Sequence, residues 1–380
     1  MRILFVIENR PHEHAGGRYH GLLHALSLAE LGHEVTYCTN VLPIFYDDVL
    51  KYFKVNENTW KVHLTKKWGW DIYKDGYDLF IGFPVIGGDA AAWFGHECKK
   101  PAISVILESP QWVSSVYGRD VTRDAEWKDW GNYIKAFDKN AWCLDTSLEG
   151  SKYSLQWIKA QYPEYDASHM LQCYCPINDR AISSDSSKRF IPYDQRQNQI
   201  MFIGRLVTYK NYCLPIEIAA THQSKPSVVV IAGHWLKEHK EALETQAKKA
   251  NVQLQLLFHI TEEQKFSLIK NSKLMINASL FEGLSLSPIE AAFCFTPCIA
   301  YDLPIMREVH TVNDKCVVHL AKWGNIKDAI QKAHEVLNFG DQDGFGSKKD
   351  RINIMKSYRD RFSIDAVKNK LDTIVRKICQ

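Results

Sequence analysis

Short apolar runs alternate with amphipathic stretches along most of the chain. Residues 3–7 are apolar at every position, which is typical of a strand buried on both faces. A helical pattern follows over residues 19–31 and stops at Gly32, and residues 33–39 predict a second strand. This order of strand, helix and strand indicates a parallel sheet covered by helices. Further strands are predicted at residues 77–83, 102–107 and 141–145.

A second series of the same kind begins at residue 199. Residues 176–198 precede it and are polar, rich in Ser and Asp, and without apolar periodicity. Strands are predicted at 199–205, 227–233, 252–258, 273–279 and 297–301, and helices at 214–222, 239–250, 261–272 and from residue 288. A chain of 380 residues is long enough for two domains of roughly 150–200 residues. We therefore expect an α/β protein with two Rossmann-like domains that face a cleft and bind ligands at the carboxyl ends of their strands.

The last part of the chain is basic and amphipathic. Apolar positions recur at helical spacing after Ser363, and a helix with so wide an apolar face must bury it. Residues 347–380 hold ten Lys and Arg against four Asp and Glu, a net charge of +6. Such a surface is either solvated or in contact with a membrane. The net charge of the whole chain is only +3, which argues against a dedicated nucleic-acid binder.

The composition indicates a cytoplasmic protein. No apolar run approaches the roughly 20 residues that a membrane span needs. The N-terminus, MRILFVIENRP, lacks the apolar core and cleavage site of a signal peptide. Ten cysteines lie in apolar segments without metal-ligand spacing, which indicates free thiols in a reducing compartment. We expect a cytoplasmic location, with peripheral membrane contact through basic residues as an alternative.

Three loops at predicted strand ends carry residues suited to anion binding. Gly16 and Gly17 precede a helix, where backbone N–H groups can approach a phosphate. Gly204 and Arg205 end a strand, and Lys210 follows five residues later. Arg can bind a diphosphate with two hydrogen bonds and Lys can act as a point charge. The simpler alternative is that both cations are solvated.

The third loop, NASLFEGLSLSPIEAA at residues 277–292, holds two glutamates, Glu282 and Glu290. Ser287 and Pro288 suit a helix start, with Ser as the N-cap, Pro at the first helical position and Glu290 closing a capping box. On that interpretation Glu290 only stabilises a helix end. The other interpretation is that both carboxylates contact a ligand.

Together these loops resemble the retaining glycosyltransferases of family 4, which have the GT-B fold. FIGRLVTYKN is similar to that family's Gly-Arg…Lys segment, and FEGLSLSPIEA is similar to its E-x7-E signature. The resemblance covers most of the second half, whereas residues 40–175 show little of it. It implies an acceptor-binding domain at 1–180, a linker at 181–197 and a nucleotide-sugar-binding domain at 198–362, with residues 363–380 crossing back as a helix to the first domain.

The resemblance also assigns roles to the loop residues. Arg205 and Lys210 would act as catalytic cations that bind the donor diphosphate and stabilise the departing nucleotide. Glu282 would lie beside the transferred sugar, and Glu290 would accept hydrogen bonds from the ribose hydroxyls. The donor-binding positions that it implies besides Glu290 are Gly16, Gly17, Gly204, His259, Ile260, Gly283, Leu284 and Ser285.

One position departs from the family pattern. Many members carry a His near the acceptor where this chain has Glu108 in SVILESPQW. Glu108 is therefore a candidate for positioning the acceptor, and His12, His14 and His20 are the alternatives.

The implied reaction is transfer of a sugar, with retention of configuration, from a UDP- or GDP-sugar to a saccharide or glycoconjugate acceptor. No cofactor and no catalytic metal are expected. The D-x-D sequence at residues 341–343 lies in a Gly-rich polar loop and is interpreted as solvated. Two alternatives remain at this point: an inactive glycosyltransferase-like binding or scaffold subunit, and a sugar-nucleotide epimerase.

Overall fold

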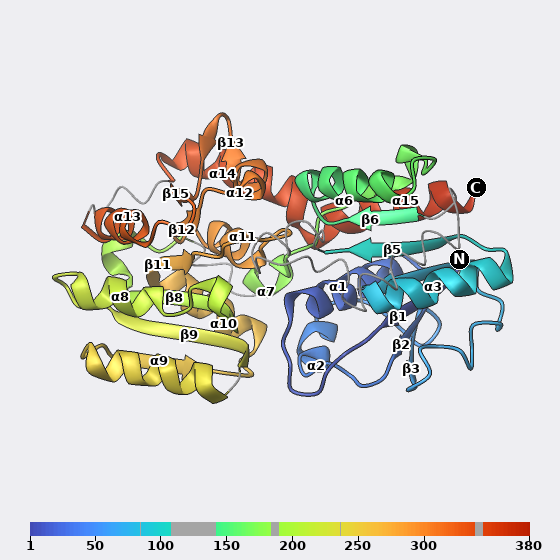
Figure 1. Cartoon of the computed structure of the whole chain (residues 1–380), viewed down its shortest axis with the longest axis horizontal. Coiled ribbons are helices and arrows are strands. Elements are labelled where there is room, and N and C mark those ends of the chain that lie inside the picture. The colour runs from blue at the N-terminus through green and yellow to red at the C-terminus, as the bar shows by residue number, and fades with distance from the viewer. Residues whose placement is uncertain (84, 108–141, 184–189, 236, 339–344) are drawn as a thin grey trace. The chain divides into compact units, whose positions relative to one another are not determined.

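The computed structural model describes residues 1–83, 85–107, 142–183, 190–235, 237–338 and 345–380. The chain divides into two compact units (Figure 1). The first consists of Met1–Pro176 with Ile364–Gln380, and the second of Ile177–Ser363. Each unit has its own parallel sheet.

In the described part of the first unit, seven parallel strands are ordered β3-β2-β1-β4-β5-β6-β7. They are β1 (Arg2–Ile7), β2 (Glu34–Thr39), β3 (Trp60–Leu64), β4 (Leu79–Phe83), β5 (Ala102–Ile106), β6 (Trp142–Asp145) and β7 (Met170–Gln172). The helices are α1 (Gly16–Glu30), α2 (Tyr46–Leu50), α3 (Val85–Cys98), α6 (Leu148–Gln161) and α15 (Ile364–Cys379). The five predicted strands are confirmed, whereas β3 and β7 were not predicted. The strand order reverses at β1 and β4, which creates a topological switch point.

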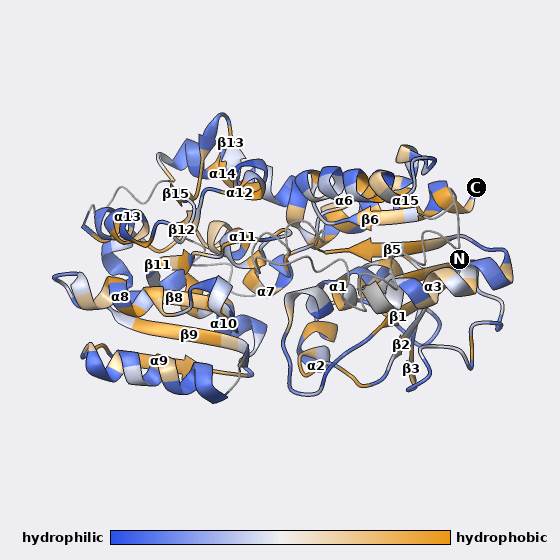
Figure 2. Ribbon diagram, in the orientation of Figure 1, coloured by the Kyte–Doolittle hydropathy of each residue, from blue (hydrophilic) through white to orange (hydrophobic). Residues whose placement is uncertain are grey.

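In the described part of the second unit, six parallel strands are ordered β10-β9-β8-β11-β12-β15. They are β8 (Gln197–Leu206), β9 (Ser227–Trp235), β10 (Leu254–Leu257), β11 (Ser272–Asn277), β12 (Cys298–Tyr301) and β15 (His319–Ala321). The helices are α7 (Asp179–Ser183), α8 (Leu214–Thr221), α9 (Lys237–Lys249), α10 (Glu262–Asn271), α11 (Leu286–Phe293), α12 (Pro304–His310), α13 (Ile326–Asn338) and α14 (Lys348–Phe362). Strands β13 (Thr311–Val312) and β14 (Lys315–Cys316) form a small separate hairpin. Figure 2 shows the hydrophobic β9 against the largely hydrophilic outer helix α9.

The last helix belongs to the first unit. α15 packs against α1, and Leu371 is 1% exposed. Lys368 Nζ lies 2.9 Å from Glu30 Oε2, and His33 Nε2 lies 2.8 Å from Asp372 Oδ1. The predicted fold of two Rossmann-like units with a returning terminal helix is therefore confirmed.

The residues interpreted as a linker are built into the second unit. The sequence placed this linker at 181–197, but the second unit already begins at Ile177. The Ile177 N–H donates to the carbonyl of Phe362 at 2.7 Å. Arg196 is 4% exposed, and its guanidinium donates to the carbonyls of Ser272 and Phe295. A polar sequence can thus be buried when its polar groups find partners.

Candidate active site

The predicted catalytic residues of the second unit lie at or after the ends of two neighbouring strands. β8 ends at Leu206 and β11 ends at Asn277, and the two strands pair in parallel. Their following loops therefore leave the same edge of the sheet. β9 and β10 lie on one side of this pair, and β12 and β15 lie on the other. Open α/β sheets bind ligands at such a switch point.

The two loops are tied together by hydrogen bonds and ring packing. The Leu280 N–H donates to the carbonyl of Tyr209 at 2.9 Å, and Asn211 Nδ2 donates to the carbonyl of Ala278 at 2.7 Å. The rings of Tyr209 and Phe281 lie 4.5 Å apart between centroids. Asn211 adopts a left-handed φ of 49°, which Asn tolerates better than most residues. The Gly-Arg…Lys segment and the E-x7-E segment thus form one structure.

Three of the predicted catalytic residues meet around Tyr209. Lys210 Nζ lies 2.5 Å from Glu282 Oε1, in a pair whose side chains are 17% and 9% exposed. The same ammonium lies 5.5 Å from the centre of the Tyr209 ring. Arg205 Nη2 donates to the Tyr209 hydroxyl at 2.8 Å. Tyr209 was not singled out from the sequence, although it lies within the quoted segment.

The capping-box interpretation of Ser287 and Glu290 is wrong. α11 begins at Leu286, and its N-cap, Ser285, makes no side-chain capping hydrogen bond. The reason lies in β11, because Asn277 Nδ2 donates to the hydroxyls of both Ser285 and Ser287 at 2.9 Å. The Glu290 carboxylate is directed to a different partner.

Glu290 belongs to a buried ionic cluster with Lys265 and Glu262. Lys265 Nζ donates to Glu290 Oε1 at 2.6 Å and to Glu262 Oε1 at 2.7 Å. Burial by itself lowers the pKa of Lys265, but the two carboxylates outweigh it and the pKa lies above its ordinary value. Burial raises the pKa of Glu290, and Lys265 opposes that shift. The sequence analysis assigned no role to Lys265 or Glu262; their only signal was the i, i+3 spacing of opposite charges.

The other predicted donor-binding positions lie at the same end of the strands. Gly204 precedes Arg205 at an irregularity in the pairing of β8 with β9 that extends to Leu206. His259 and Ile260 follow β10, and His259 is exposed with a φ of 59°. Gly283 and Leu284 are buried, and Ser285 is half-buried.

The two glycines of the first unit differ in their surroundings. Both open α1, which follows β1 at the switch point of the first sheet. A Cβ on Gly17 would lie 2.3 Å from Leu107 Cδ1, whereas a Cβ on Gly16 would meet nothing within 4 Å. A side chain at Gly17 therefore requires the Leu107 methyl group to shift, whereas Gly16 has open space around it.

The acceptor-side candidates are partly described. Glu108 lies outside the described residues, as does the D-x-D sequence at 341–343. His12 is exposed, and the ring of His14 lies 4.5 Å from that of Phe45. His20 is buried, and neither of its ring nitrogens bonds to a described residue. Burial lowers the pKa of His20 well below its ordinary value, so this ring is neutral.

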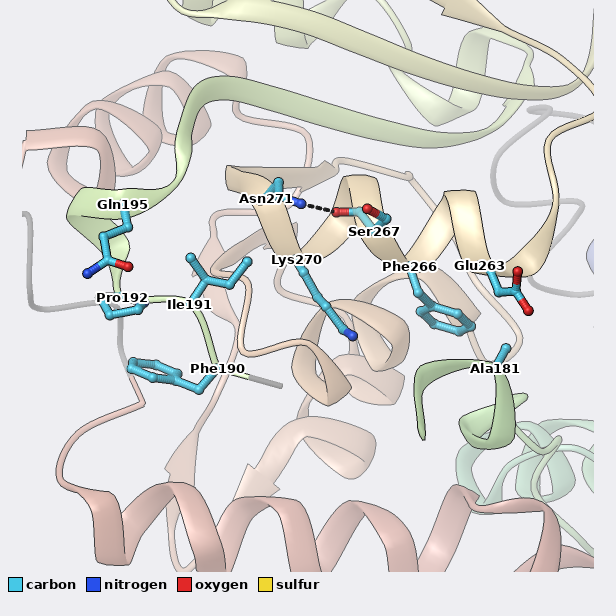
Figure 3. A pocket seen from close by; sticks show the side chains of 10 residues that line it. All are labelled: Ala181, Phe190, Ile191, Pro192, Gln195, Glu263, Phe266, Ser267, Lys270 and Asn271. Carbon is cyan, nitrogen blue, oxygen red and sulfur yellow. Dashed lines mark hydrogen bonds between the residues drawn. The ribbon is translucent and has the colours of Figure 1, made fainter. Parts of the chain in front are cut away.

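A separate cavity of about 660 Å³ lies beside α10. Figure 3 shows the Lys270 side chain between Phe190 and Phe266, with Asn271 Nδ2 donating to the carbonyl of Ser267. None of the predicted site residues lines this cavity. It is therefore distinct from the site at the ends of β8 and β11.

The described parts of the chain lack a candidate metal centre and a helix suited to span a membrane. No group of three or more His, Cys, Asp or Glu side chains there could hold a metal ion. All ten cysteines fall within those parts and are free. No described helix combines the length and apolar character needed to cross a membrane.

The fold and the site segment both resemble glycosyltransferases. Residues 183–338 match the family described as glycosyl transferases group 1, an interval that contains both loops and the ionic cluster. The fold is the GT-B fold of two Rossmann-like domains. WaaG, a glycosyltransferase involved in lipopolysaccharide biosynthesis, has a TM-score of 0.70 at 12% identity, with 99% of each chain covered.

Particular relatives are similar to this chain over different lengths. HepE from Anabaena, solved with UDP and glucose, has a TM-score of 0.74 at 12% identity and covers 99% of this chain and 100% of its own. Alpha-1,3/1,6-mannosyltransferase ALG2 of Dictyostelium discoideum is 30% identical over 143 residues, which is 37% of this chain and 32% of that protein. The chain thus matches about a third of the length of this curated relative.

Proposed function

We propose that this protein is a glycosyltransferase that moves a sugar from a nucleotide-diphosphate sugar to a saccharide or glycoconjugate acceptor. The observation that carries the proposal is the meeting of Arg205, Lys210 and Glu282 at the switch point of a sheet whose segment matches a glycosyltransferase family. Retention of anomeric configuration is part of the proposal and is supported by the resemblance to family 4. The proposed location is cytoplasmic.

In the proposed reaction the cations act directly in leaving-group departure. When the bond from the anomeric carbon to the diphosphate breaks, negative charge grows on the phosphate oxygens. The Lys210 ammonium has three donors, and Glu282 takes one of them in the described structure. The other two remain for phosphate oxygens, and the nearby Arg205 adds a second positive charge. Such preorganised charges stabilise a developing anion without reorganisation.

Glu282 contacts Lys210, and in this proposal it also meets the transferred sugar. Its side chain is 9% exposed, so it occupies a largely dry site in which electrostatic interactions are strong. The diphosphate is a good leaving group once the two cations neutralise it. The proposed reaction therefore needs neither a covalent carboxylate nucleophile nor a metal ion.

UDP and GDP are the proposed nucleotides. HepE, which has the same fold, was solved with UDP, and this favours testing UDP first. A thermal-shift series with UDP, GDP, ADP and dTDP identifies the nucleotide, because ligand at 100 times its Kd stabilises the folded protein by about 2.7 kcal/mol. Transfer is then measured with the matching sugar nucleotide, with and without EDTA, and NMR of the product gives the anomeric configuration.

Each result of this series has a definite meaning. Sugar transfer with retention, undiminished by EDTA, is expected. Nucleotide binding without transfer to any acceptor would favour a scaffold subunit, and interconversion of the sugar nucleotide would favour an epimerase. Binding of none of the four nucleotides would contradict the proposal.

The two glutamates are expected to act on different steps. Glu290→Gln should weaken nucleotide binding by about 10- to 100-fold, the value of a hydrogen bond to a charged group, with a smaller effect on kcat. Glu282→Gln should lower kcat and leave nucleotide affinity almost unchanged. Calorimetry with the bound nucleotide and turnover measurements separate the two effects. Equal losses of affinity in both variants would contradict this division.

A further inference from the structure

Lys265 lies buried between two carboxylates at the N-terminal end of α10. The side chains of Lys265, Glu262 and Glu290 are 7%, 3% and 5% exposed. Removing three charges from water is costly, and exchanging such a cluster for apolar residues is often neutral or stabilising. Stability is therefore a weak explanation for this cluster.

The position of the ammonium is fixed by the start of α10. Thr261 and Gln264 form a reciprocal capping box, with the Thr261 hydroxyl accepting from Gln264 N at 3.2 Å and Gln264 Oε1 accepting from Thr261 N at 2.9 Å. Lys265 lies one residue further on and extends to α11, where it bonds to Glu290 Oε1. Among the described residues no hydrogen bond reaches Glu290 Oε2. One oxygen of this carboxylate is thus held internally and the other is unbound.

We propose that Lys265 is a positioning residue for nucleotide binding. Lys265 orients the Glu290 carboxylate so that its Oε2 accepts hydrogen bonds from the ribose hydroxyls. This inference rests on the proposed function. Glu262 lies on α10 with Lys265 and accepts a second hydrogen bond from the ammonium, so Lys265 bonds to both carboxylates at once. The cluster then carries one net negative charge.

The charges around Glu290 determine when it is ionised. The charged groups that shift its pKa are Lys265, which lowers it, and Glu262, which raises it; burial is the largest cause and raises it. Cys294, which directly follows α11, is neutral because burial raises the pKa of its thiol to about 12. The described residues of α14, β11 and β12, which also pack on α11, add no further shift.

The loss of Lys265 has a predictable effect on pH dependence. Without the ammonium, burial and Glu262 both favour the protonated form of Glu290. The acceptor form is lost as pH falls through the pKa of Glu290, so this loss occurs at higher pH in Lys265→Met than in the wild type. Removing the Glu262 charge lowers the pKa of Glu290, so the acceptor form is then lost at lower pH than in the wild type.

The test is calorimetry with UDP and 2′,3′-dideoxy-UDP, or with the GDP pair if UDP does not bind, between about pH 5.5 and 9. The wild type is expected to prefer the ribonucleotide by about 10- to 100-fold. Lys265→Met should lose most of that preference near neutral pH, regain it at high pH and keep its affinity for the dideoxynucleotide. Lys265→Arg should keep the preference, as should Lys270→Met, a matched control for a buried lysine on the same helix. Glu262→Gln should keep the preference for the ribonucleotide down to a lower pH than the wild type does.

The outcomes distinguish the two proposals. A wild type that binds neither nucleotide contradicts the proposed function. A wild type that prefers the ribonucleotide, with Lys265→Met unchanged in preference and pH profile, overturns only the role of Lys265. An equal loss of affinity for both nucleotides in Lys265→Met also overturns the proposed role of Lys265, because a purely structural role would give that result. If Lys265→Met does not fold, an unshifted pH profile in Glu262→Gln overturns the inference.

Discussion

Lys210→Ala is expected to lower turnover by about 100- to 1,000-fold, the usual effect of removing one preorganised charge-stabilising donor. Lys210 is the residue whose ammonium contacts Glu282 at 2.5 Å, so its loss removes a phosphate ligand and also leaves a buried carboxylate without its cation. Lys210→Arg retains the charge and should recover part of the rate. Single-turnover and steady-state rates with the matched sugar nucleotide measure the effect.

Controls separate this loss from a loss of folding. Lys237→Ala removes a lysine whose side chain is 86% exposed on α9 and should retain wild-type turnover. Arg205→Ala tests the same mechanism at the second cation, whose guanidinium donates to the hydroxyl of Tyr209. The assignment of the site would be contradicted if Lys210→Ala and Arg205→Ala both unfolded thermally like the wild type and both kept turnover within threefold of it.

The sequence predicted those features whose cause is local. β1 and β8 were found because strands buried on both faces are continuously apolar. The cations were found because Arg205 lies near the end of such a strand and Lys210 lies in the turn after it. β3 was missed because it is a half-exposed edge strand, in which the apolar run is broken. Burial of Arg196 was missed because the carbonyls it satisfies lie 76 and 99 residues further along the chain.

The capping-box error and the missed lysine have a common origin. Ser287, Pro288 and Glu290 fit a helix start by local rules, but Asn277 takes the serine hydroxyls and Lys265 takes the carboxylate. Both partners come from other elements, β11 and α10, and local spacing carries no information about them. Local patterns therefore predicted the strands, whereas they did not predict these hydrogen-bond partners.

Removal of α15 is expected to unfold the first unit. The helix contributes five side chains that are at most 6% exposed: Ile364, Val367, Leu371, Ile374 and Val375. Each fully buried branched side chain contributes about 1.5–3 kcal/mol, so the five together supply roughly 8–15 kcal/mol. That is comparable to the whole free energy of unfolding of a domain, about 5–15 kcal/mol. A chain ending before Ser363 should therefore be insoluble or inactive, and a soluble, active truncation would show that α15 is dispensable.

A single substitution tests the same contact without removing the helix. Leu371→Ala should lower the free energy of unfolding of the first unit by about 2–5 kcal/mol, because it opens a cavity at a side chain that is 1% exposed. Ile352→Ala is the matched control, since this branched side chain on α14 is 59% exposed and its loss should change stability by no more than about 0.5 kcal/mol. Urea unfolding followed by circular dichroism measures both. The half-buried ion pair of Lys368 with Glu30 remains in Leu371→Ala, so a loss of the expected size would come from apolar packing of α15. Equal stability of the two variants would contradict the burial of this helix on α1.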